Sequence, residues 1–276
     1  MSGLSLKDSL NASNNAYSTS QSFAALPGYE IIKSARVTKS GMQAVAYQNL
    51  TTGEILISYQ GTNLSDPAMI AAQVAADKDL AQGKTPPMFI DARAFYDDVR
   101  VKFGNTPIYL TGHSIGGGAA EYIAATRPDV AGGITWGAPG IGYPGIPGFP
   151  SSVHPSDPSK FVNIVDKQDK IGNFVPVNGS HFGQVSLIGV DGPSDVEAHY
   201  LLNYSQWLGI PLGNDKSSSG QQDLIYNGKL TDNSNGGILI EKNSYGTFLY
   251  DYKYALASNG NNYATELALK AALRII

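Results

Sequence analysis

The chain has 276 residues, of which 42% are apolar and 15% charged, so it can bury a sizeable core in one large domain or two small ones. Its formal net charge of −4, without a cluster of Lys and Arg, argues against a nucleic-acid-binding surface. The absence of cysteine excludes disulfides, thiolate nucleophiles and Cys-ligated metals, and any imidazole must come from one of 4 histidines.

The expected secondary-structure elements alternate between strands and helices. The apolar, β-rich runs that predict strands lie at 30–37, 43–47, 54–59, 107–111, 133–137, 161–165 and 183–190. The runs that predict helices lie at 66–82, 87–103, 115–127 and 195–208. This alternation indicates an α/β fold with a mostly parallel central sheet flanked by helices.

Three segments depart from that alternation. The N-terminal segment, 1–28, is rich in Ser, Asn and Ala and lacks the basic and apolar regions of a signal peptide. Residues 139–158 are rich in Pro and Gly and predict a long irregular wall. A polar stretch at 213–222 opens a short C-terminal β/α extension, 213–276, which we expect to pack on a core formed by 29–212.

The pentapeptide Gly112-His113-Ser114-Ile115-Gly116 has the pattern of a nucleophile elbow. It lies between a strand-like run and an Ala-rich helix, where so sharp a turn strains the central residue and leaves no room for Cβ atoms beside it. The Ser114 hydroxyl is therefore predicted to be a nucleophile, and the Ile115 N–H one donor of an oxyanion hole. The alternative is a Gly-rich helix start with a capping serine.

Three stretches resemble the class 3 (fungal-type) lipases of the α/β-hydrolase superfamily, in the family's order, over roughly residues 43–205. Residues 109–117 resemble the nucleophile region, 57–62 the strand that ends in an Arg-Gly-Thr or Arg-Gly-Ser turn, and 135–139 the Thr-Phe-Gly-x-Pro strand end. The resemblance implies the α/β-hydrolase fold. It also implies Thr62 as the second oxyanion donor, through its backbone and its hydroxyl. Gln60 stands where the family usually has Arg, so a salt bridge made by that Arg is absent.

A serine nucleophile needs a base, and the chain order Ser, Asp, His of α/β-hydrolases restricts the choice. This order excludes His113 and disfavours His154, which lies in the Pro-rich segment before either candidate carboxylate. His199, in Val196-Glu197-Ala198-His199-Tyr200, resembles the family's late Asp-His-x-x-Tyr segment and is predicted to be the base, with His181 as the alternative.

Two aspartates compete for the role of the acid that orients this base. Both Asp166 and Asp169 follow the predicted strand at 161–165. Asp169-Lys170-Ile171 resembles the family's Asp-x-Val/Ile context, so Asp169 is predicted to be the acid. Asp166 directly ends the strand, where it would cap the turn.

Two apolar segments are candidates for substrate binding. Class 3 lipases carry a lid after the oxyanion turn, and residues 63–75 with Met69 and Ile70 fit either a lid that meets lipid or an ordinary amphipathic helix packed on the sheet. In the Pro-rich segment, the residues expected to line an acyl-binding wall are Ile141, Tyr143, Ile146 and Phe149.

Together these features predict a serine carboxylester hydrolase that acts on ester or lipid substrates such as acylglycerols, without a metal or an organic cofactor. Phospholipase A1 and short-chain or feruloyl-type esterases would use the same residues, and so would an acyltransferase. A non-catalytic binding module of this fold is the alternative from another class. The long uncharged stretches are interrupted by Gly, Pro and polar residues, so no transmembrane helix is expected. The resemblance favours a secreted protein, and the apolar Ile275-Ile276 end suggests a domain from a longer chain.

Overall fold

The computed structural model of the chain describes residues 3–18, 22–63, 67–142, 155–176, 179–189 and 195–212, with only the backbone for 67–70. The C-terminal extension at 213–276 lies outside these residues, and the predicted division of the chain at 28 and 212 stays a prediction. The predicted site residues outside the described side chains are Met69, Ile70, Tyr143, Ile146 and Phe149, as is the disfavoured His154.

Seven strands form one sheet whose spatial order follows the chain. They are β1 (Tyr29–Ala35), β2 (Ala44–Asn49), β3 (Ile55–Tyr59), β4 (Ile108–His113), β5 (Gly132–Trp136), β6 (Phe161–Asp166) and β7 (Gln184–Ile188). The first three pair antiparallel, and β3 to β7 pair parallel. The predicted α/β class with a mostly parallel sheet is confirmed. Because parallel strands end at the same edge, the loops after β3, β4, β5 and β6 meet there.

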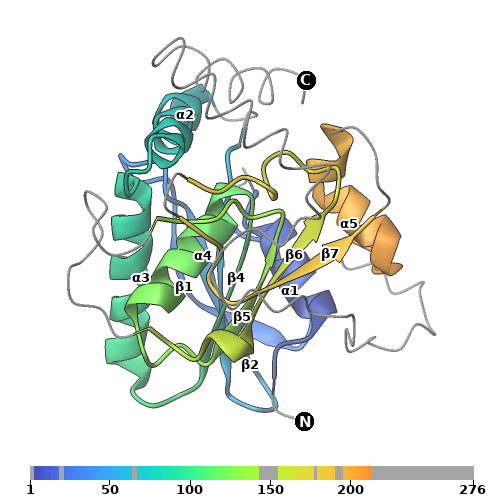
Figure 1. Cartoon of the computed structure of the whole chain (residues 1–276). Helices are drawn as coiled ribbons and strands as arrows, with labels where there is room; N and C mark the ends of the chain where they lie inside the picture. The colour runs from blue at the N-terminus through green and yellow to red at the C-terminus, as the bar shows by residue number, and fades with distance from the viewer. Residues whose placement is uncertain are drawn as a thin grey trace.

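Helices cover both faces of this sheet (Figure 1). On one face lie α1 (Leu6–Asn15) and α5 (Leu201–Leu208), and on the other lie α2 (Pro67–Ala81), α3 (Pro87–Phe103) and α4 (Ile115–Thr126). Two short 3-10 turns, Pro158–Lys160 and Glu197–His199, precede β6 and α5. Within the described part of the chain, none of the helices combines the length and apolar character that crossing a membrane requires.

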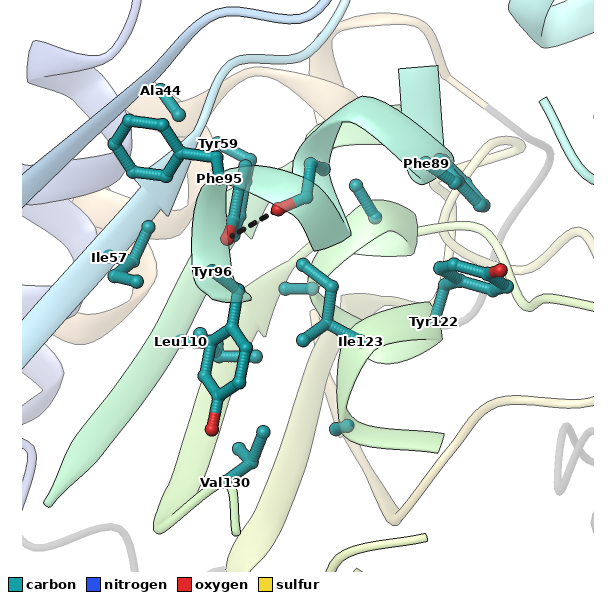
Figure 2. Packing of buried hydrophobic residues seen from close by; sticks show 14 of the residues in the cluster. Ala44, Ile57, Tyr59, Phe89, Phe95, Tyr96, Leu110, Tyr122, Ile123 and Val130 are labelled. Atoms are coloured by element: carbon teal, nitrogen blue, oxygen red, sulfur yellow. Dashed lines mark hydrogen bonds between the residues drawn. The ribbon is translucent and has the colours of Figure 1, made fainter. Parts of the chain in front are cut away.

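Each face of the sheet buries its own apolar layer. Figure 2 shows the layer under α3 and α4, where Phe89 and Tyr122 pack together and the Tyr59 hydroxyl donates to the Ala92 carbonyl at 3.2 Å. On the opposite face, Leu10 of α1 packs in a cluster with Trp136 of β5 and other apolar residues. Burying a side chain of the size of Leu10 contributes about 1.5–3 kcal/mol, so both layers stabilise the packing of the helices on the sheet.

The helix α1 is absent from the elements expected from sequence. Its buried residues include Leu6 and Leu10, but also the polar Ser9 and Ser13. Ser13 hydrogen-bonds through its hydroxyl to Thr111 Oγ1 on β4, at 2.9 Å. Half of this helix consists of Ser and Asn, residues that favour caps and turns over helix interiors, so its composition does not indicate a helix.

The expectation of a single helix at 195–208 is wrong for the first part of that range. Glu197–His199 forms a 3-10 turn, Tyr200 is extended with φ −72° and ψ 142°, and only then does α5 begin. The His199 carbonyl oxygen lies 2.6 Å from His113 Nε2, and since a carbonyl can only accept, the imidazole is the donor. His113, at the end of β4, thus donates to the carbonyl that would accept from a backbone N–H in a continuous helix, and the chain turns at Tyr200.

Candidate active site

Ser114 lies at the sharp turn between β4 and α4. Its backbone has φ 58° and ψ −138°, and among the described residues it alone combines a positive φ with a side chain. A Cβ on Gly116 would come within 2.6 Å of the Gln60 backbone, and one on Gly112 within 2.6 Å of the Gly116 backbone. The strained elbow expected from sequence is present, and the Ser114 side chain makes no capping hydrogen bond.

Three predicted residues come together at the carboxyl edge of the sheet. Ser114 Oγ lies 2.9 Å from His199 Nε2, and His199 Nδ1 lies 2.9 Å from both carboxylate oxygens of Asp169. All three side chains are buried, Asp169 completely. An ionised carboxylate only accepts, so His199 donates through Nδ1, which leaves Nε2 free to accept the hydroxyl hydrogen of Ser114.

The environment of Asp169 keeps its carboxylate ionised. Burial pushes the pKa of Asp169 upward, but the neighbouring His199 and hydrogen bonds to the ionised form outweigh burial and leave the pKa below its ordinary value. Oδ1 accepts from the N–H groups of Ile171 at 2.8 Å and Gly172 at 3.0 Å, and Oδ2 accepts from the Tyr204 hydroxyl at 2.7 Å. A charged Asp169 therefore stabilises the imidazolium form of His199.

Tyr204 was missed by sequence reasoning. The family segment that His199 resembles has its tyrosine at the position occupied here by Leu202, whose side chain is 56% exposed. The break at Tyr200 sets the direction of α5, and this direction brings the buried Tyr204 against Asp169. No local sequence signal separates Tyr204 from other tyrosines of the chain.

The two alternative site residues have other partners. The Asp166 carboxylate accepts from Gln168 N at 2.8 Å and from Asn203 Nδ2 at 3.0 Å, as expected for a residue that caps the strand end. His181 Nδ1 lies 3.0 Å from Glu121 Oε1 of α4, and its Nε2 donates to the Gly172 carbonyl at 3.0 Å. His181 therefore connects the nucleophile helix to the loop that carries Asp169.

The candidate oxyanion donors lie on either side of Ser114. Ile115 is the first residue of α4, where a backbone N–H has no acceptor within the helix and the helix dipole favours negative charge. A Cβ on Gly61 would lie 2.9 Å from Ser114 Cβ, so the turn that leads to Thr62 lies against the nucleophile.

The Thr62 hydroxyl differs from the sequence expectation. It donates to Asp77 Oδ2 of α2 at 2.9 Å, so its hydrogen points to a carboxyl group instead of being free for the oxyanion. Burial raises the pKa of Asp77 from 3.8 to about 7, although the Thr62 hydrogen bond and His199 oppose this rise. Only the backbone N–H of Thr62 remains as its candidate donor while Asp77 is charged.

Of the residues predicted to bind substrate, Ile141 is the one whose side chain is described. It is 1% exposed, belongs to the apolar layer under α3 and α4, and pairs with Ser180 through an isolated β-bridge. Its part in an acyl-binding wall stays a prediction, as do the roles of Met69, Ile70, Tyr143, Ile146 and Phe149.

Comparisons with known proteins find similarity at the level of structure. A comparison with protein-family models finds no match, and neither does one with curated protein sequences. Fungal lipases are among the structural neighbours of this chain. The nonglycosylated LIP2 lipase of Yarrowia lipolytica is 18% identical over 66% of this chain and 77% of its own, with a TM-score of 0.44.

Two further lipases show the same level of similarity. The Rhizomucor miehei lipase in its propeptide complex is 17% identical over 58% of this chain and 57% of its own, with a TM-score of 0.37. The lipase of Rhizopus microsporus var. chinensis is 18% identical over 61% of this chain and 64% of its own, with a TM-score of 0.39. The chain thus spans less than two thirds of these two proteins. The assignment of an α/β fold with a mostly parallel sheet comes from the strand order and the elbow described above.

Proposed function

We propose that this chain is a serine carboxylester hydrolase with lipase-like specificity for acyl esters. One observation carries the proposal: Ser114 Oγ lies 2.9 Å from His199 Nε2 at a strained elbow, and His199 is held from its other side by a buried carboxylate. A nucleophile, a base within hydrogen-bond reach and a group that orients the base are together what nucleophilic acyl transfer requires.

In the first half of the proposed reaction, Ser114 Oγ attacks the ester carbonyl carbon while His199 Nε2 takes the hydroxyl proton. The carbonyl oxygen becomes an oxyanion, which the N–H groups of Ile115 and Thr62 stabilise. Loss of one such donor typically costs about 3–4 kcal/mol of transition-state stabilisation. The imidazolium then protonates the leaving alcohol as the bond between the carbonyl carbon and that oxygen breaks, and the acyl group remains on Ser114.

In the second half, water replaces the alcohol. His199 Nε2 takes a proton from this water as its oxygen attacks the acyl carbon, and the same oxyanion donors act again. Collapse of the tetrahedral intermediate returns the proton to Ser114 Oγ and releases the carboxylic acid. Asp169 stays ionised throughout and holds His199 in the tautomer that both halves need.

The substrate class within ester hydrolysis follows from the resemblance to class 3 lipases, and acylglycerols are the proposed substrates. Phospholipase A1 and short-chain or feruloyl-type esterases remain the alternatives, because they use the same catalytic residues. A series of p-nitrophenyl esters of rising chain length, with a triglyceride emulsion and a phospholipid, separates the three. Hydrolysis of the emulsion is the expected result, and activity on phospholipid or short esters alone would replace the lipase assignment.

The test of the enzymatic proposal is covalent labelling of the serine. A fluorophosphonate probe is expected to label the wild-type protein and not Ser114→Ala, and the variant is expected to lose ester hydrolysis with a nearly unchanged melting temperature. A wild-type protein that is folded yet unlabelled would support the non-catalytic binding module instead. An acyltransferase would transfer the acyl group to an added alcohol in preference to water, which product analysis detects.

A further inference from the structure

The phenol of Tyr17 lies between three segments of the candidate active site. Its hydroxyl lies 2.7 Å from His113 Nδ1, and it also forms a hydrogen bond with the Gly61 backbone. His113 Nε2 in turn lies 2.6 Å from the His199 carbonyl oxygen. Tyr17 follows the C-terminus of α1, so an N-terminal residue connects the oxyanion turn, the nucleophile elbow and the segment of the proposed base.

The absence of a side chain at Gly61 leaves the space that this hydroxyl occupies. A Cβ on Gly61 would overlap the Tyr17 oxygen, and it would also lie 2.5 Å from the His113 carbonyl oxygen. The rings of Tyr17 and His113 lie 5.8 Å apart between centroids, and those of His113 and His199 lie 4.6 Å apart. The three aromatic side chains therefore form a row of ring contacts that ends at the proposed base.

The hydrogen bonds of this row have one consistent set of donors. Burial raises the pKa of Tyr17 above its ordinary range, so its hydroxyl keeps its proton. Burial and the neighbouring His199 lower the pKa of His113 to about 3, so this imidazole is neutral and carries one ring hydrogen. The His199 carbonyl can only accept, so that hydrogen is on Nε2, and Nδ1 accepts from Tyr17.

Removal of the Tyr17 hydroxyl would leave Nδ1 of His113 without its donor, whereas the hydrogen on Nε2 stays where the His199 carbonyl requires it. The imidazole would then be free to tilt away from its 2.6 Å contact with that carbonyl. A longer contact would allow the backbone of residue 199, and the ring that lies beside His113, to shift. A small displacement of a catalytic group is enough to slow an acyl transfer substantially, because reaction depends on aligned geometry.

We propose that Tyr17 is a positioning residue for the reaction of Ser114, which holds His199 in place by fixing the ring of His113. The inference rests on the proposed function, since it concerns the same base. Tyr17 acts through His113 and reaches His199 at its backbone, so its effect belongs to the chemical step and not to substrate binding.

The first test is the kinetics of Tyr17→Phe, which removes the hydroxyl and keeps the ring. We expect kcat to fall about tenfold with KM unchanged, because geometry at the base matters in the transition state more than in the bound substrate. Tyr29→Phe is the matched control. Its hydroxyl donates to Asp8 Oδ2 of α1 at 3.1 Å, away from the catalytic residues, so the control removes a hydrogen bond to the same helix and should retain wild-type kcat.

The second test separates the path through His113 from a direct effect of Tyr17. The amide nitrogen of His113→Gln reaches about as far as His113 Nε2 and can donate to the His199 carbonyl without a hydrogen bond from Tyr17. In this background Tyr17→Phe is therefore expected to change kcat less than twofold, whereas His113→Ala should lose at least as much as Tyr17→Phe. If the effects of the two substitutions on kcat simply multiply in the double variant, the path through His113 would be overturned.

The third readout is spectroscopic and does not depend on turnover. The chain has only 4 histidines, so ¹⁵N-imidazole spectra resolve each ring, and His113→Gln identifies the His113 signals. The wild type is expected to show His113 with its hydrogen on Nε2, and Tyr17→Phe to keep this tautomer while the His199 signals shift. Wild-type kcat or unchanged His199 signals in Tyr17→Phe would overturn the proposal, while loss of turnover in Ser114→Ala would still support the hydrolase. Full turnover in Ser114→Ala would instead reject the hydrolase itself.

Discussion

The hydroxyl of Tyr204 donates to Asp169 Oδ2 at 2.7 Å, so the helix that follows His199 returns to hold the acid that orients it. Base and acid are thus stabilised by one short stretch of chain, through the 3-10 turn at Glu197–His199 and the first turns of α5. This arrangement makes the orientation of His199 sensitive to residues that do not contact a substrate.

Tyr204→Phe tests that dependence. A hydrogen bond to a charged group contributes about 1.5–3 kcal/mol, so we expect kcat to fall about tenfold or somewhat more. Tyr59→Phe is the control, because it also removes a buried hydroxyl, at the Ala92 carbonyl on the opposite face. Equal kcat values for the two variants would show that the Tyr204 hydroxyl has no part in orienting Asp169.

The choice between the two aspartates is tested by Asp169→Asn and Asp166→Asn. An amide at 169 favours the wrong tautomer of His199, so kcat should fall by about 10⁴. An amide at 166 can still accept from Gln168 N, and kcat should stay within about threefold of wild type because Asp166 caps the strand end. The opposite ranking of steady-state rates would exchange the roles of the two residues.

His199 and His181 are expected to separate activity from stability. His199→Ala should abolish turnover with little change in unfolding. His181→Ala removes one hydrogen-bond partner of the buried Glu121, whose other carboxyl oxygen keeps the Phe182 N–H, and should cost about 1–3 kcal/mol, measured by urea denaturation. His181→Gln keeps a donor at this position, so its folded fraction should retain most of the wild-type kcat per fluorophosphonate-labelled site. Inactive but fully labelled His181→Gln would place His181 in the chemistry.

Asp77 is expected to make the stability of the protein depend on pH. Its pKa is raised by burial from 3.8 to about 7, so the folded chain holds a proton that the unfolded chain releases. The stability from this proton is fully present below pH 4 and is lost as the pH rises to 7, by up to about 4 kcal/mol at 1.36 kcal/mol per pH unit. Compared with wild type, Asp77→Asn should therefore gain relative stability between pH 4 and pH 7. A difference between the two denaturation curves that is constant with pH would contradict the raised pKa of Asp77.

The elbow could be predicted because its determinants are local. A strand-like run, two glycines that flank the serine and an Ala-rich helix follow one another directly, and the backbone of Ser114 has the strained conformation that this order requires. The mostly parallel sheet was predictable for a similar reason, because its strands are apolar, β-rich runs that alternate with helical segments. In α1, Ser and Asn make up half of the residues, so the helix was not expected.

The sequence by itself determined which chemistry is available: one serine at an elbow, a histidine to be chosen from 4, and no thiol. Tertiary structure alone brought His199 to Ser114, added Tyr17 and Tyr204, and turned the Thr62 hydroxyl toward Asp77. The physical reason is distance along the chain. Ser114 and His199 are 85 residues apart, and Tyr17 and His113 are 96 apart, so these contacts depend on strand register and helix direction, which no local pattern encodes.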